Sequence, residues 1–179
     1  MIKSIKTSKG EIIIRDASLA DAERYRELRL FALKESPTAF SADYELNARQ
    51  PMSFWKNRLK PDEHGIIFVA EYEKQLIGMI GIRKGDSSKT KHSAGIWGVY
   101  VHPEWRGLHI AEGLIELCCE WAKLREVQIA KLAVVATNES AIHLYERSGF
   151  TIYGTEPNAL RVKGRYYDEI YMSRSLIDS

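Results

Sequence analysis

The chain has 179 residues, about the size of one domain and long enough to enclose a hydrophobic core. Its 26 basic and 24 acidic residues leave a net charge of +2, which does not favour a nucleic acid or an anionic membrane as the main partner. No stretch approaches the ~20 apolar residues of a membrane span, and the polar, basic residues 1–10 do not resemble a signal peptide. We therefore expect a cytoplasmic protein with a single domain over residues 1–179.

Hydrophobic periodicity divides the chain into short strands and helices. In chain order, it predicts a strand over residues 11–15, helices over 19–33 and 53–59, strands over 66–72, 76–82 and 96–101, a helix over 107–122, a strand over 131–136, a helix over 138–148, and strands over 150–153 and 165–174. Asp16 or Ser18 caps the first helix, and Pro37 ends it. Asn138 caps the last helix, and Gly149 ends it. This order predicts an α/β (α+β) fold with a mixed sheet.

The two cysteines, Cys118 and Cys119, are adjacent in a helical pattern. Neighbouring side chains on a helix point about 100° apart, so a disulfide between them is not expected. Two cysteines at this spacing do not form a metal site either. We expect Cys118 to be buried and Cys119 to be partly exposed, both as free thiols in a reducing compartment.

The first segment with chemical interest is the turn at Arg106 and Gly107, where a predicted strand leads directly into a helix. The backbone N–H groups at a helix start are unpaired, and together with the helix dipole they bind anions such as phosphate. Gly107 allows close approach of a ligand to the backbone, and Arg106 adds a cation. On these grounds alone, an ordinary strand–helix turn with one glycine remains the alternative.

The second segment is the helix that starts at Asn138, which contains Tyr145 on one of its apolar faces. A tyrosine in this setting either packs in the core with its hydroxyl hydrogen-bonded or takes part in a functional site. Neither the helix nor the tyrosine alone distinguishes these two roles.

Taken together, the two segments resemble the GNAT superfamily of N-acetyltransferases. The cofactor loop of that family reads Arg or Gln, two residues, Gly, one residue, and Gly or Ala, and it corresponds here to Arg106, Gly107, Leu108, His109, Ile110 and Ala111. The later family helix is matched at Asn138, Ala141, Leu144, Tyr145, Gly149 and Phe150. Residues 99–103 and 164–168 are also similar, and residues 28–40 resemble one bacterial branch whose substrates are mostly unassigned.

The resemblance implies a mixed, mostly antiparallel central sheet of about seven strands flanked by about four helices. It also implies a splayed pair of parallel strands that holds acetyl-CoA, here residues 99–101 and 131–136. Backbone groups of Val99, Tyr100 and Val101 would hold the pantetheine arm and thioester. The loop from Arg106 to Ala111 would hold the pyrophosphate, and Asn138 would reach the pantetheine. No metal is implied.

One residue departs from the family pattern, because His109 stands where the loop has its central glycine. Backbone amides bind the phosphates, so a side chain at this position is compatible with binding. Its imidazole must then point away from the pyrophosphate or form a hydrogen bond with it.

The resemblance implies direct transfer of an acetyl group from acetyl-CoA to a primary amine, with Tyr145 as the general acid that protonates the leaving thiolate. The amine has to be neutral to attack, and the carbonyl oxygen needs an N–H donor, for which a backbone amide near Val101 is available. Base candidates without a motif are Glu71, His92 and Asp168, and a proton path through water would also serve. His102 lies beside the cofactor loop but is better explained as a turn histidine before Pro103.

The acceptor is not identified by these residues. A small-molecule amine and a protein N-terminal amine both remain open, and a homodimer is possible because dimers are common in the family. The main alternative is an acyl-CoA sensor without catalysis, although Tyr145 has no purpose in a pure sensor. A nucleotide-binding protein that uses the Gly107 turn lacks the Gly-Lys-Ser/Thr phosphate loop. Nothing in the charge pattern favours a scaffold domain.

Overall fold

The computed structural model describes residues 1–177. In chain order the elements are β1 (Ile2–Thr7), β2 (Gly10–Asp16), η1 (Leu19–Asp21), α1 (Ala22–Glu35), η2 (Pro37–Ala39), α2 (Tyr44–Ala48), α3 (Met52–Leu59), β3 (Gly65–Tyr72), β4 (Gln75–Lys84), β5 (Ser93–Val101), η3 (Pro103–Trp105), α4 (Ile110–Lys123), β6 (Ile129–Val135), α5 (Glu139–Arg147), β7 (Thr151–Val162) and β8 (Arg165–Ser175). All of the strands and helices expected from the sequence are present, within a few residues at their ends, except that the strand expected over 150–153 extends to Val162 as β7.

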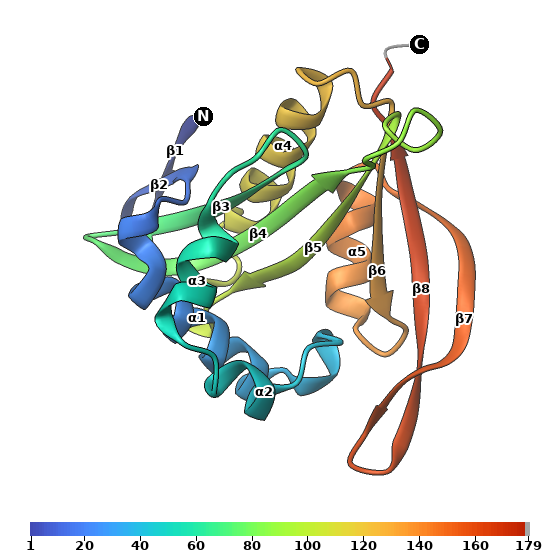
Figure 1. Ribbon diagram of the computed structural model, residues 1–179, viewed down its shortest axis with the longest axis horizontal. Helices are drawn as coiled ribbons and strands as arrows, with labels where there is room; N and C mark the ends of the chain where they lie inside the picture. Colours follow the sequence, from blue (N-terminus) through green and yellow to red (C-terminus); the bar gives the residue numbers. More distant parts are fainter. Residues whose placement is uncertain (178–179) are drawn as a thin grey trace.

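The strands form one 8-stranded sheet in the order β1-β2-β3-β4-β5-β6-β8-β7 (Figure 1). All neighbours are antiparallel except β5 and β6, which are parallel. This pair is in register only from Ser93–Ile129 to Gly95–Lys131, so the rest of the two strands diverges. The expected mixed, mostly antiparallel sheet with a splayed parallel pair is therefore confirmed.

Two elements in the described residues were not expected, namely strand β1 and helix α2. In β1, Ile2 and Ile5 are three residues apart, so the strand period of two does not appear in its apolar residues. The strand forms the edge of the sheet, and Lys3 and Lys6 are typical of an edge that does not pair further. Helix α2 has only 5 residues, too few to show a helical period.

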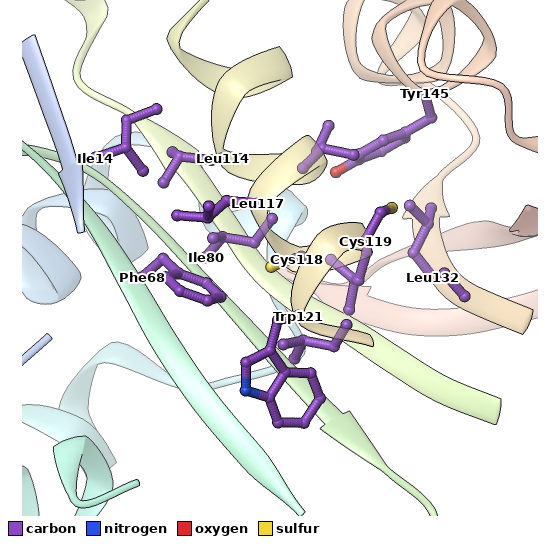
Figure 2. Packing of buried hydrophobic residues seen from close by; sticks show 14 of the residues in the cluster. Ile14, Phe68, Ile80, Leu114, Leu117, Cys118, Cys119, Trp121, Leu132 and Tyr145 are labelled. Atoms are coloured by element: carbon purple, nitrogen blue, oxygen red, sulfur yellow. The ribbon is translucent and has the colours of Figure 1, made fainter. Parts of the chain in front are cut away.

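The helices cover both faces of the sheet and create two hydrophobic cores. Helices α4 and α5 pack on one face, whereas α1 and α3 pack on the other (Figure 1). Figure 2 shows Leu114, Leu117 and Trp121 of α4 packed beside Phe68 and Ile80 of the sheet. The central strand β4 is buried over seven consecutive residues because helices cover it on both sides.

Both cysteines are free and buried within α4. The expectation that Cys119 would be partly exposed is wrong, because only 3% of its surface is accessible. Its sulfur lies 3.7 Å from Nη1 of Arg174, a residue of β8 that covers this side of the helix. Between residues 1 and 177, no helix is long and apolar enough to cross a membrane.

Candidate functional site

The divergence of β5 and β6 opens a cavity of about 470 Å³. On the β5 side, the divergence is caused by a bulge, since the register of pairing between β5 and β4 shifts between Met79 and Gly81. Gly98 in this bulge has a φ of +66°, a left-handed conformation that suits glycine. The cavity is lined from one face of the sheet by residues of α4 and α5, and from the other by Ser36, Ala39 and Phe40.

A loop with unpaired backbone donors borders the cavity just before α4. Gly107 and His109 both adopt left-handed backbone conformations, with φ of +77° and +59°. The first helical hydrogen bond inside this turn runs from the amide of Gly113 to the carbonyl of His109. The amides of residues 107–112 have no acceptor among the described residues. A helix start with this many free N–H groups is an anion-binding site.

His109 presents its imidazole to solvent, with 81% of the side chain exposed. Nδ1 lies 3.5 Å from a carboxylate oxygen of Glu112, one turn into α4. The side chain is thus held beside the helix, and the backbone amides of the loop stay accessible. A histidine in place of the loop glycine therefore does not close the turn.

Arg106 is turned toward the protein. Its Nε donates a 3.1 Å hydrogen bond to the carbonyl of Val101, and its Nη2 donates a 2.9 Å hydrogen bond to Glu35. The guanidinium also lies 5.7 Å from the ring centroid of Tyr100. Half of the side chain remains exposed at the cavity edge.

Asn138 and Tyr145 reach the cavity from α5. The side-chain oxygen of Asn138 accepts a 3.2 Å hydrogen bond from the amide of Ala141, which is the expected N-cap. Tyr145 is buried against Phe150, with ring centroids 6.1 Å apart. Its ring points from α5 toward α4 (Figure 2). The hydroxyl has no hydrogen-bond partner among residues 1–177, and burial raises the pKa of Tyr145 well above its usual value.

The structure brings almost all of the site residues predicted from sequence to one cavity. Those that line it are Val99, Tyr100, Val101, Arg106, Gly107, His109, Ile110, Ala111, Asn138 and Tyr145. The exception is Leu108, whose side chain packs against the hydrophobic core on the α4 side.

The three base candidates do not line the cavity within the described residues: Glu71, His92 and Asp168. His102 does not line it either. Glu71 accepts a 2.9 Å hydrogen bond from Nε of Arg15, and Asp168 accepts one of 2.8 Å from the amide of Asn158. These two carboxylates therefore serve structural contacts elsewhere.

Two features of the site were missed in the sequence, both from the end of α1 and the following turn. Phe40 forms part of the cavity wall, and its ring lies 6.3 Å from that of Tyr100. Glu35 accepts hydrogen bonds from Arg106 and from the hydroxyl of Tyr100. Burial acts to raise the pKa of Glu35, but hydrogen bonds from Ser36, Arg106 and Tyr100 outweigh it and hold the pKa below its usual value. Both positions lie in the segment 28–40 that resembles one bacterial branch of the family, but that resemblance assigns them no role, since their role depends on contacts with β5 and the loop before α4.

Comparison with known proteins agrees with this geometry. Residues 25–150 match the model of the acetyltransferase (GNAT) family. The L-amino acid N-acetyltransferase AaaT of Escherichia coli is 29% identical over 171 residues, which cover 92% of this chain and 98% of that protein. A GNAT-family acetyltransferase from Streptococcus pneumoniae has the same fold, with a TM-score of 0.82 at 20% identity, over 92% of this chain and 99% of that one. The structure of YncA, a putative acetyltransferase from Salmonella typhimurium solved with acetyl-CoA, has a TM-score of 0.76 at 19% identity, over 94% and 95%.

The fold, with its splayed strand pair beside a loop of free amides, is that of an acyltransferase. The chain belongs to the GNAT family of acetyltransferases.

Proposed function

We propose that the protein transfers the acetyl group of acetyl-CoA directly to a primary amine, and that residues 1–179 form one domain for this purpose. The observation that carries the proposal is the meeting of three features in one cavity: the free amides before α4, the splay between β5 and β6, and the unpaired hydroxyl of Tyr145. The fold neighbour YncA, which was solved with acetyl-CoA, supports the choice of the acyl donor.

The residues present fit this substrate. The amides of residues 107–111 would bind the pyrophosphate, and Arg106 would add positive charge at the edge of that loop. On its β6 side, β5 has no paired strand at Val99–Val101, so backbone groups on that side would be available to the pantetheine arm and the thioester, except the carbonyl of Val101, which accepts a hydrogen bond from Arg106. Asn138 lies where the same arm would pass α5.

In the proposed reaction, acetyl-CoA supplies an activated acetyl group. The neutral amine forms a C–N bond with the carbonyl carbon, the C–S bond breaks, and Tyr145 gives its proton to the departing sulfur. The amine nitrogen loses one proton to water, and the phenolate of Tyr145 regains one from water. The raised pKa of Tyr145 is consistent with this role in one respect, because the phenol holds its proton before the reaction.

A small-molecule amine or a protein N-terminal amine would serve as acceptor. The name of the Escherichia coli relative makes L-amino acids the first acceptors to test.

The proposal is tested by thermal unfolding with acetyl-CoA, with ATP as the control ligand, followed by transfer assays on a panel of amines. A ligand at 100 times its Kd adds about 2.7 kcal/mol of stability, which for a chain of this length corresponds to a rise of roughly 5–11 °C in Tm. We expect this shift with acetyl-CoA only, and N-acetylated product with at least one amine. No shift at millimolar acetyl-CoA would contradict the proposal. A full shift without transfer to any amine would instead identify an acyl-CoA sensor.

A further inference from the structure

Arg29 is a buried cation without a counterion. It lies on the core-facing side of α1, where only 4% of its surface is accessible. Its Nε and Nη1 are sealed from solvent and have no hydrogen-bond partner in residues 1–177. Burial lowers the pKa of Arg29; Tyr25 acts in the opposite direction, and the neighbouring Arg58 adds a smaller lowering effect. A buried guanidinium destabilises the folded protein unless a hydrogen-bond or charge partner binds it, so the position of Arg29 requires an explanation.

The guanidinium lies directly behind the wall of the cavity, and Arg29 itself is not among the lining residues. Its Cζ is 4.4 Å from the ring centroid of Phe40, and Nη1 is 3.5 Å from the point that a Cβ on Gly98 would occupy. Phe40 and Gly98 both line the cavity. Gly98 also directly precedes Val99–Val101, the segment assigned above to the thioester. The cation therefore lies close to the place where an amine would attack.

The contact with Phe40 leaves the donors of Arg29 unpaired, and of these Nη2 is not among the atoms sealed from solvent, so it is the donor that a ligand reaches first. A cation over a ring uses the flat face of the guanidinium, whereas its N–H groups lie in the plane and at the edge. That edge matches the two oxygens of a carboxylate, with which arginine forms paired hydrogen bonds. Glycine at position 98 keeps side-chain atoms away from this edge.

The nearby carboxylates have other partners, so they do not explain Arg29. Glu35, at the end of the same helix, is held by Arg106 and Tyr100. The other buried polar residue of this region, Asp21, is held by Arg15. Arg29 is the buried guanidinium of the described chain that is left for a ligand from outside.

We propose that Arg29 binds the carboxylate of the acceptor, so that the acceptor is an amino acid whose amine lies beside Val99–Val101. This inference rests on the proposed function, because it assumes that an amine is acetylated in the cavity. It adds the chemical class of the acceptor and the residue that selects it.

The test compares the common L-amino acids with their carboxamides in transfer assays, and by calorimetric titration of the CoA-bound protein. Each amide keeps the amine and the side chain but lacks the negative charge. We expect the acids to be favoured by about 30-fold or more in kcat/KM, the usual effect of removing one partner of a desolvated ion pair. In Arg29→Met this preference should disappear through a loss on the acids alone, while the Kd for acetyl-CoA stays the same.

Arg58→Met is the matched control, because it removes a neighbouring guanidinium that already lies over Trp97 and contacts Tyr25. It should keep the preference for acids. If Arg29→Met does not fold, Arg29→Lys can replace it: lysine retains the charge without the paired hydrogen-bond geometry and should weaken the preference for acids. The comparison of acids with amides in the natural protein requires no variant at all. Equal use of acids and amides would overturn the role of Arg29 and leave acetyl transfer intact. Neither binding nor acetylation of any amino acid would also overturn it, whereas loss of the acetyl-CoA shift would refute the proposed function itself.

Discussion

The carboxylate of Glu35, at the end of α1, accepts a 2.9 Å hydrogen bond from Nη2 of Arg106, which lies in the loop before α4. The same carboxylate accepts a 3.2 Å hydrogen bond from the hydroxyl of Tyr100 on β5. These contacts join the end of α1, just before the cavity-lining residues Ser36, Ala39 and Phe40, to the loop with the free amides. They also place one negative charge beside a loop that we expect to bind phosphate, with Arg106 as its counterion.

Arg106→Gln should weaken acetyl-CoA binding mainly because it leaves Glu35 unpaired near the phosphates. We expect an increase of about five- to tenfold in Kd. The double variant Glu35→Gln/Arg106→Gln removes both charges and should recover most of this loss. Calorimetric titration of the four proteins in this cycle measures the coupling. An equal loss in the single and the double variant would show that Arg106 acts on the phosphates directly.

Tyr145→Phe should lower kcat by about 10²- to 10⁴-fold, since the leaving sulfur loses its proton donor. The hydroxyl has no described hydrogen-bond partner, so Tm and the KM for acetyl-CoA should change little. The raised pKa of Tyr145 also predicts that kcat does not fall between pH 7 and 9 through loss of this proton. Tyr153→Phe, on the exposed surface of β7, is the control and should keep the natural kcat. Full activity of Tyr145→Phe, with acetyl transfer shown to be rate-limiting, would exclude the general-acid role.

His109 occupies a left-handed backbone position, which costs about 1–2 kcal/mol for a residue with a side chain. His109→Gly should therefore unfold at the same temperature or higher. His109→Val should lose about 1–2 kcal/mol, because a β-branched side chain tolerates this conformation least. Since the imidazole projects away from the loop amides, the Kd for acetyl-CoA should change less than about threefold in His109→Gly. Thermal unfolding and titration test both parts, and a large loss of affinity would show that the imidazole binds the phosphates.

Asp21 should make stability depend on pH. Hydrogen bonds from Arg15 hold the pKa of this buried carboxyl well below its usual range. A carboxyl whose pKa is lowered in the folded protein stabilises the fold at pH values above its pKa in the unfolded chain. This stabilisation is lost as the pH falls toward the pKa in the folded protein. Asp21→Asn should thus lose about 3–5 kcal/mol of unfolding free energy at pH 7.

The difference between the natural protein and Asp21→Asn should shrink as pH falls below about 4, where the unfolded carboxyl is protonated. Urea unfolding of both proteins at pH 7, 5 and 3 measures this difference in unfolding free energy. Asp62→Asn breaks an exposed pair with Arg83 and should change stability by less than about 1 kcal/mol. A difference for Asp21→Asn that stays constant down to pH 3 would contradict this account.

Much of the fold was predictable because its elements carry local signals. Strands β3 and β4 are apolar runs joined by a tight turn, in which Glu73 and Lys74 adopt left-handed conformations. Helix α5 begins at the cap Asn138 and ends before Gly149, whose φ is +82°. Strand β1 was missed because its stability comes from pairing with β2 and not from its own apolar pattern.

The site was predictable only where the family pattern is local. The loop before α4 and the helix with Tyr145 each lie within one short segment, so their residues stand out. Arg29 also lies on an apolar helix face in the sequence, but its isolation depends on residues from α3, β5 and the turn at Phe40 that pack around it. The link between Glu35 and Arg106 likewise joins residues that are distant in sequence.

The separation of β5 from β6 has a consequence for the kinetics. In the proposed reaction, a cavity lined by α4 and α5 on one face of the sheet and by η2 on the other would receive the two substrates from opposite sides. Neither substrate then has to leave before the second one enters. Double-reciprocal plots at several fixed concentrations of the second substrate should give intersecting lines, and no acetylated form of the protein should accumulate when acetyl-CoA is added alone.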